Sequence, residues 1–198
     1  MRRRHLLAAV GGGSLVGLAG CTDGDSGGDD AADSGAESDG SSESDGGSVS
    51  DEGSEPNPDA DWPSESYADY DTTVVEVRGS DDERLGAVTA AVAETGDQRY
   101  LGLSDAETLP DDAGMLFVFP EPRESLTFVM REMDFGIDIV YADSEGTITR
   151  IHNAPEPGPN EDGGDQRYPG SGQYVLEVPY KWTDRNGVET GDTLAFEL

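Results

Sequence analysis

Three short apolar runs lie close together in residues 114–143, and they constrain the fold more than any other feature of the chain. They occupy residues 115–119, 126–130 and 137–141, separated by connections that contain proline, glycine and charged residues. Runs of this length between such connections are typical of buried strands rather than helices. Apolar side chains occupy both faces of the first run, so a strand there is expected to be covered on both sides.

The flanking residues predict further strands and two short helices. Strands are expected at residues 73–78, 84–94, 146–151, 173–178 and 193–198, and helices at 97–103 and 179–186. The alanine-rich stretch 84–94 also fits a helix, but its place in the family pattern described below favours a strand.

Local signals refine this prediction. Thr95 and Gln98 have the spacing of a capping box, and the helix they start would turn Tyr100, Leu101 and Leu103 inward. Residues 154–172 are expected to form a long loop, which in a compact domain is usually functional or disordered. The fold class that follows for residues 72–198 is all-β with short helices, arranged as an antiparallel β-sandwich or a barrel-like β domain.

The chain is strongly acidic, with a net charge of −31, and residues 72–198 alone hold 26 acids against 9 bases. Such self-repulsion destabilises a compact state at low ionic strength. It is screened in molar salt, where the Debye length is about 3 Å. We therefore expect a protein of a halophilic organism; an ordinary acidic protein with an acidic tail would explain only the charge before residue 72. The acidity also argues against nucleic acid as a partner.

Residues 1–21 are expected to be a signal peptide of the twin-arginine type. Three arginines precede an apolar stretch at 6–19 that is too short to span a membrane. Residues 18–21 (LAGC) resemble a lipobox, which predicts lipidation of Cys21; a free cysteine is the alternative. Two hydrocarbon chains there would hold the protein stably on the cell membrane, facing the extracellular side.

Residues 22–71 are expected to form a disordered tether. They contain 17 acids and no base, in a sequence dominated by aspartate, serine and glycine. Such a segment buries too little apolar surface to offset the entropy of ordering. Its serines could also carry glycans.

Six segments, taken in order, resemble the domain-of-unknown-function family 192 (DUF192) of bacteria and archaea. They read RYLGL at 99–103, GMLFVF at 114–119, FVM at 128–130, IDI at 137–139, YVLEVP at 174–179 and GD at 191–192. The resemblance covers residues 73–198, and with the leader it indicates a secreted lipoprotein of the haloarchaeal type. It implies a β-sandwich of jelly-roll type and no established activity.

The chain also departs from the family pattern. Val129 stands where the family has tryptophan, Ser104 where it has methionine, and residues 131–133 read Arg-Glu-Met in place of Lys-Asn-Thr. If the family's tryptophan and asparagine contribute to a ligand site, that site is altered here.

Two carboxylates in apolar strands are the main candidates for chemistry. An unpaired Asp138 would be expensive to bury, so it needs a cation or backbone donors. Arg99 is its expected partner, either in a structural ion pair or facing a ligand. Glu177 lies between Leu176 and Val178 and could act with Asp138 as a catalytic pair.

His152 and Asn153 end a predicted strand beside the long loop, where they are either exposed or part of a site. Phe128 and Met130 share one face of their strand, and they complete the tentative ligand-binding set with Arg99, Asp138, His152, Asn153 and Glu177. The methionines at 115, 130 and 133 could bind a soft metal, but they are more typical of core filler. With one histidine after the leader and Cys21 as the only cysteine, neither a metal nor a cofactor is expected.

The function expected from the sequence is a membrane-anchored, extracellular β domain that binds an envelope component such as a glycan, and that is not an enzyme. Tyr168, Tyr174 and Trp182 near loops would serve such binding. A hydrolase that uses Asp138 and Glu177 is the first alternative, and a structural or assembly partner of another envelope protein is the second.

Overall fold

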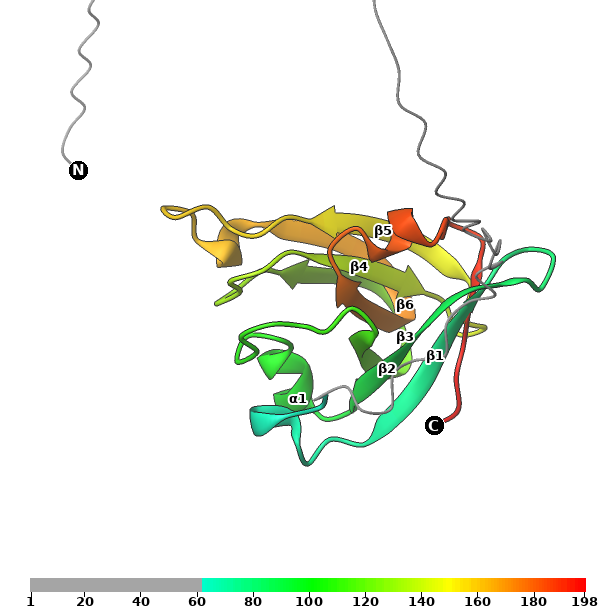
Figure 1. The fold of residues 1–198 in the computed structure, drawn as a ribbon, viewed down its shortest axis with the longest axis horizontal. Coiled ribbons are helices and arrows are strands. Elements are labelled where there is room, and N and C mark those ends of the chain that lie inside the picture. Colours follow the sequence, from blue (N-terminus) through cyan, green and yellow to red (C-terminus); the bar gives the residue numbers. More distant parts are fainter. Residues whose placement is uncertain (1–61) are drawn as a thin grey trace, which may run out of the picture. The chain divides into compact units, whose positions relative to one another are not determined.

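The structure is a computed structural model, and it describes residues 62–198. The expected signal peptide, Cys21 and most of the expected tether lie outside the described residues. Figure 1 shows the fold. Its strands are β1 (Thr72–Arg78), β2 (Arg84–Ala93), β3 (Ala113–Val129), β4 (Ile137–Ala142), β5 (Ile148–Ala154), β6 (Arg167–Pro179) and β7 (Thr193–Ala195). The helices are α1 (Gly96–Leu101) and α2 (Trp182–Arg185), with 3-10 turns η1 (Glu65–Tyr67) and η2 (Gly163–Asp165).

All seven strands belong to one sheet, in the order β5-β4-β6-β3-β2-β1-β7. Every neighbouring pair is antiparallel except β2 and β3, which run parallel from the pairing of Thr89 with Ala113 to that of Ala93 with Phe117. The connection between them carries α1, and it returns the chain to the end of the sheet where β2 began. The sheet is therefore mixed.

The sheet curls until its two edge strands approach one another. Thr147 forms an isolated bridge with Thr193, and the Ile148 N–H donates to the Asp192 carbonyl at 2.8 Å. The Leu194 N–H donates to the Gly146 carbonyl at 2.9 Å. The result is a half-barrel, visible in Figure 1 as the sweep from β5 to β1.

The predicted fold class is confirmed as β-rich with short helices, but the predicted arrangement was wrong in two respects. The sheet is mixed rather than antiparallel, because α1 sits in the connection between two neighbouring strands. A single curled sheet also takes the place of the two packed sheets of a jelly-roll sandwich, since β5 and β7 meet at the Thr147–Thr193 bridge.

Apolar side chains on the two faces of the sheet form two separate core clusters. One includes Val88, Leu116, Val140 and Leu176 and is joined by Trp182 of α2. The other includes Met115, Phe117 and Ile139 and is joined by Leu103 after α1. Both faces of the central strands are therefore covered, as the apolar run at 115–119 predicts.

Segment boundaries differ from the sequence prediction mainly around β3. The runs expected as two strands form one long strand whose register against β6 shifts on both sides of Arg123. These irregularities accommodate Pro120 and Pro122 in the exposed middle of the strand. Because β5 continues to Ala154 and β6 begins at Arg167, the loop expected over 154–172 is shorter than predicted.

The strand assignment for 84–94 is confirmed in place of the helical alternative, and so is the capping box of Thr95 and Gln98. The helix that follows ends at Leu101. Leu103 turns into the core as expected, but Tyr100 does not, since it is 73% exposed.

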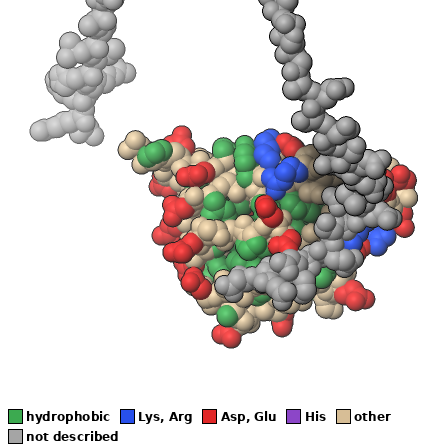
Figure 2. Space-filling view, viewed as in Figure 1, with side chains coloured by type: hydrophobic (Ala, Val, Ile, Leu, Met, Phe, Trp, Pro, Cys, Tyr) green, Lys and Arg blue, Asp and Glu red, His purple; other side chains and the backbone are tan. Residues whose placement is uncertain are grey.

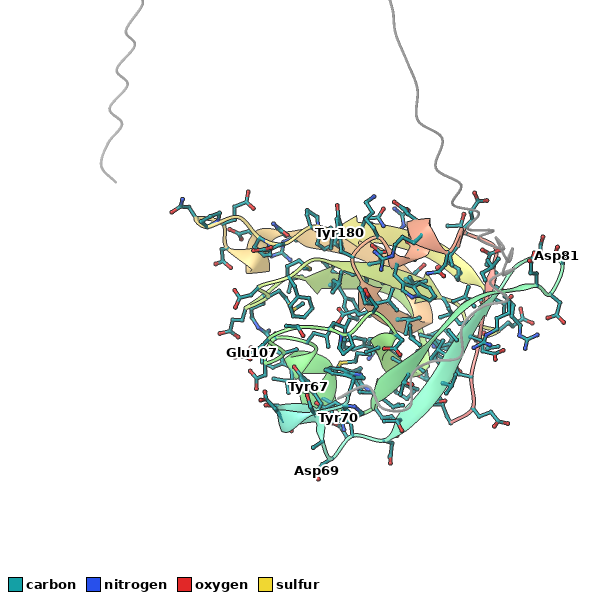
Figure 3. All side chains as sticks on the ribbon, in the orientation of Figure 1. Tyr67, Asp69, Tyr70, Asp81, Glu107 and Tyr180 are labelled. Carbon is teal, nitrogen blue, oxygen red and sulfur yellow. The ribbon has the colours of Figure 1, made fainter. Side chains whose placement is uncertain are left out.

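The last residues of the expected tether are ordered. The Trp62 indole N–H donates to the Gly114 carbonyl at 2.9 Å, and Tyr67 stacks against both Trp62 and Tyr70. Trp62 and Tyr67 are buried in the same cluster as Phe117. Figure 3 shows Tyr67 and Tyr70 next to one another at this end of the sheet. The prediction of disorder was therefore wrong for residues 62–71, because their aromatic side chains supply the apolar surface that the acidic sequence before them lacks.

Within residues 62–198, no helix is both long enough and apolar enough to cross a membrane.

Candidate functional site

A pocket of about 360 Å³ lies between α1 and the outer part of β3, with Glu177 of β6 in its wall. Its lining comes from α1 and the turn after it, from β3, and from the residues that follow β3. The apolar contributors are Leu101, Leu103, Phe117, Phe119, Leu126, Phe128, Val129 and Met133. The polar side chains are those of Arg99, Tyr100, Ser104, Thr127, Arg131 and Glu177.

The sequence around α1 fixes the wall of this pocket that is formed by α1 and the turn after it. The Thr95 hydroxyl accepts a hydrogen bond from the backbone N–H of Gln98 at 3.2 Å. In return, the side-chain oxygen of Gln98 accepts from the backbone N–H of Thr95 at 2.9 Å. Gly102 ends the helix with a φ of 54°, which disfavours a side chain. That turn sends Leu103 into the core and leaves Ser104 on the pocket wall.

Aromatic rings of β3 form the opposite wall of the pocket. Phe117 and Phe128 meet edge to face with ring centroids 4.8 Å apart, and Phe128 meets Tyr141 in the same way at 5.8 Å. The row continues beyond the pocket through His152 to Tyr168. Such edge-to-face contacts fix the ring orientations, so the pocket wall is rigid and apolar.

Arg99 and Arg131 stand at the sides of the pocket and are held mainly by backbone carbonyl groups. One nitrogen of Arg99 donates to the carbonyls of Glu94 and Val118, and its guanidinium lies 5.1 Å from the Phe119 ring centroid. Arg131 donates to the Tyr100 carbonyl and stacks 4.2 Å above the ring of that tyrosine. Both guanidinium groups are therefore fixed in position.

Glu177 is the unusual member of the lining. Its side chain is buried, with 4% of the residue exposed, and within residues 62–198 it has neither a hydrogen-bond partner nor an ion pair. Burial away from water raises the pKa of Glu177 from 4.5 to about 8. The carboxyl group is therefore neutral at pH 7, when it can both donate and accept a hydrogen bond.

Asp138 has the opposite environment, although it is equally buried. Its two oxygens accept from the Asn153 side-chain amide at 2.7 Å, the Lys181 N–H at 3.0 Å, the Thr183 N–H at 2.8 Å and the Thr183 hydroxyl at 2.6 Å. This carboxylate joins β4 to β5 and to the first turn of α2, and its role is structural.

Two expected pairings of Asp138 were wrong. Arg99 does not pair with it, because Arg99 is on the α1 side of the sheet and donates to backbone carbonyls there. Glu177 does not face Asp138 either. On the neighbouring strands β4 and β6, Asp138 is opposite Val178, the residue after Glu177. Side chains alternate between the two faces along a strand, so the two carboxylates lie on opposite faces of the sheet.

The structure thus brings together three of the seven predicted site residues, Arg99, Phe128 and Glu177. Met130 is completely buried in the adjacent core. His152 lies farther along the same face, where its Nε2 is 2.8 Å from the Pro169 carbonyl. Asp138 and Asn153 bind each other on the other face.

Ser104 and Arg131 also line the pocket, and neither was among the predicted site residues. A signal for them was present: Ser104, Val129, Arg131 and Met133 are positions at which the chain departs from the family pattern, and all four are on the pocket wall. Within the described residues, no group of three or more histidine, aspartate or glutamate side chains is placed to hold a metal ion.

The model of the DUF192 family, described as uncharacterised, matches residues 75–196, which is more than half of the chain. The matched range contains the whole pocket lining and begins after the ordered segment 62–71. No curated protein matches the chain.

Two solved structures are similar to this one. The first, from Sinorhizobium meliloti 1021, is provisionally described as a transcription regulator; it is 28% identical with a TM-score of 0.57, over 64% of this chain and 95% of that one. The second, from Novosphingobium aromaticivorans DSM 12444, is a protein of unknown function; it is 25% identical with a TM-score of 0.52, over 63% of this chain and 84% of the other.

Proposed function

We propose that this chain, which belongs to the DUF192 family, binds a small, partly apolar ligand of the cell envelope in the pocket beside α1. The family carries no assigned activity. The observation that carries this proposal is the unpartnered carboxyl group of Glu177 in the wall of an aromatic pocket. The oxygens of this carboxyl group keep some accessible surface, which the pocket provides. Placing it beside a pocket gives it a partner whenever a ligand is bound.

The dimensions and chemistry of the pocket fit a small molecule. A volume of about 360 Å³ lies within the range of small-ligand sites, which run from about 300 to 1,000 Å³. Such sites combine apolar walls with a few fixed polar groups. Here the rings of Phe117, Phe119 and Phe128 form the wall, and Arg99 and Glu177 are the fixed polar groups.

We further propose that the domain works outside the cell on a lipid anchor. The support is the sequence alone: the arginine-led leader, the lipobox that ends at Cys21, and the acidic segment that follows. The 26 acids of residues 72–198 agree with a haloarchaeal surface protein that works in concentrated salt.

A glycan remains one form that the ligand could take, but through different residues from those expected. Trp182 is buried in the core, and Tyr174 packs edge to face on Phe196 with centroids 5.0 Å apart. These rings do not offer an open platform for a sugar. A single sugar unit would instead enter the pocket beside α1.

The hydrolase alternative loses its two-carboxylate form, since Asp138 and Glu177 face opposite sides of the sheet. A raised pKa does suit Glu177 to general acid catalysis, and this one observation keeps an enzyme as the second candidate. Turnover of a bound compound would identify it. An assembly partner is the third candidate, and the absence of any small ligand would favour it.

The description of the Sinorhizobium protein as a transcription regulator does not transfer readily to this chain. Residues 72–198 hold 26 acids and 9 bases, and phosphate contacts require basic side chains. Figure 2 shows acidic side chains spread around the visible face, with few basic ones.

The test is a fragment-binding screen followed by protein-observed NMR in molar KCl, on the chain and on a variant with a blocked pocket. Leu126→Trp places a large ring on the face of β3 that carries Phe128, within the pocket lining, and Thr72→Trp places the same ring at an exposed position of β1 away from the pocket. Bound fragments should be lost in the first variant and kept in the second. Equal binding to both variants, or no fragment bound by the unmodified chain, would refute the proposal.

A further inference from the structure

The charge of the pocket is opposite to that of the domain around it. Acids outnumber bases 26 to 9 in residues 72–198, but the pocket lining contains two arginines and one acid. That acid, Glu177, is protonated at neutral pH because of its raised pKa. The pocket is therefore cationic in a protein that otherwise repels anions.

Arg99 has donors to spare for a ligand. Its two hydrogen bonds to the carbonyls of Glu94 and Val118 both come from Nη1. Within residues 62–198 no carboxylate lies within ion-pair distance of this guanidinium, and neither Nε nor Nη2 has a hydrogen-bond partner. A guanidinium has five N–H donors in a planar fork that matches a carboxylate.

Arg131 contributes less to the charge of the pocket. Its guanidinium is 3.6 Å from the Glu132 carboxylate, which is largely exposed, and it also donates to the Tyr100 carbonyl and to the Ser104 hydroxyl. Its main effect is to hold the turn after α1 against β3. Arg99 is therefore the primary anion-binding group.

Glu177 adds a second polar group to the same pocket, opposite Met115, whereas Arg99 binds the Val118 carbonyl farther along β3. A protonated carboxyl group donates one hydrogen bond, and a bond from O–H to a carboxylate is short and charge-assisted. A neutral amide or alcohol would accept from Glu177 more weakly and would leave Arg99 without its counter-charge.

Resting on the function proposed above, we propose that the occupant is a small organic carboxylate, with its anionic group on Arg99 and its apolar ring against Phe117, Phe119 and Phe128, in the same pocket as the Glu177 carboxyl. In molar salt the Debye length is about 3 Å, so long-range attraction contributes little and direct contact must supply the affinity. Arg99 and the rings of the pocket wall supply such contacts directly.

The site should lose its anion as pH rises through the pKa of Glu177, near 8. Ionised Glu177 would place a negative charge in the pocket wall and repel a carboxylate. The other ionisable groups around Glu177 are Tyr67 of η1, Tyr141 of β4, and Arg99, Tyr100 and Arg131 of the lining. Burial raises the pKa values of both Tyr67 and Tyr141 to about 12, so neither tyrosine titrates in this range.

The experiment uses matched acids and neutral analogues, titrated calorimetrically into the protein in molar KCl. Phenylacetate is compared with phenylacetamide, and glucuronate with glucose, which separates an aromatic or aliphatic acid from a sugar acid as the source of the carboxylate. We expect at least one acid to bind about tenfold more tightly than its neutral analogue. Its affinity should fall about tenfold between pH 6 and pH 9 in the unmodified chain, and about threefold or less in Glu177→Gln.

Arg99→Met should abolish the preference for the acid and leave the neutral analogue unaffected, whereas Arg185→Met, on α2, should change neither. Equal affinity for acid and neutral analogue would overturn the carboxylate assignment and leave the binding function intact. If no member of either pair bound, the carboxylate assignment would fall, and the fragment screen described above would decide the binding function separately. A folded Arg99→Met variant that retained the acid preference would overturn the role of Arg99; heteronuclear NMR spectra of each variant establish that it is folded.

Discussion

Replacing Glu177 with glutamine should stabilise the domain at neutral pH and remove part of its pH dependence. In the folded chain the pKa of Glu177 is about 8, against an ordinary value of 4.5. Between these two values the folded state keeps a proton that the unfolded chain has released. The contribution of Glu177 to the free energy of unfolding is therefore fully present below about pH 4.5, falls as pH rises from there, and is lost above about pH 8.

The size of the effect follows from the shift. Each pH unit between about 4.5 and 8 lowers the free energy of unfolding by about 1.4 kcal/mol. At pH 7 the folded chain is therefore destabilised by about 3 kcal/mol. Glutamine has nearly the same shape and remains neutral, so Glu177→Gln avoids this cost. We therefore expect the variant to exceed the unmodified chain by about 3 kcal/mol in free energy of unfolding at pH 7, and by less than about 1 kcal/mol near pH 5.

Guanidinium titrations in molar KCl at several pH values would measure both free energies of unfolding. The many other acids titrate in both proteins, so the difference between them isolates Glu177. Glu107→Gln is the matched control, because it removes the same charge from an exposed position, labelled in Figure 3, and should change stability by less than about 0.5 kcal/mol. A difference between Glu177→Gln and the unmodified chain that did not vary with pH would refute the reasoning.

Three further predictions concern the rest of the chain. Asp138→Ala should cost about 3–5 kcal/mol in chemical unfolding, because it leaves the buried donors of Thr183 and Asn153 without an acceptor; a cost below about 1 kcal/mol would contradict its structural role. Trp62→Ala should lower stability by about 3–5 kcal/mol, and Trp62→Phe by clearly less, since phenylalanine keeps the ring contact and loses only the bond to Gly114; equal stability of both variants and the unmodified chain would show that this segment does not hold the domain. Cys21→Ser should move the protein from the membrane fraction to the medium in cell fractionation, and retention in the membrane would contradict lipid anchoring.

The strands of this fold were largely predictable because their signals are local. Apolar runs at 115–119 and 137–141 identify buried strands, and the Thr95–Gln98 spacing identifies the start of α1. The pairing of strands was less accessible. Whether β3 runs parallel or antiparallel to β2 depends on how the connection through α1 crosses the sheet, and nothing in the strands themselves encodes that path.

The order of residues 62–71 was missed for a different reason. Their acidic composition continues that of the preceding segment, and an average over the whole stretch conceals three aromatic residues. Trp62 and Tyr67 are buried because the face of the sheet that carries Phe117 needs further cover beyond α1. Whether an aromatic residue in an acidic segment has such a surface to cover is a property of the folded domain.

Asp138 and Glu177 show most directly why the site could not be derived from the sequence. They are both buried acids in apolar strands, and they are one register step apart on neighbouring strands β4 and β6. On the α2 side, the first turn of the helix and Asn153 supply four donors, so Asp138 is a satisfied structural carboxylate. On the α1 side no hydrogen bond or ion pair to Glu177 is found among residues 62–198, and burial raises its pKa. The difference lies in what each helix presents to the sheet, and it leaves Glu177 as the buried acid with a hydrogen bond to offer a ligand.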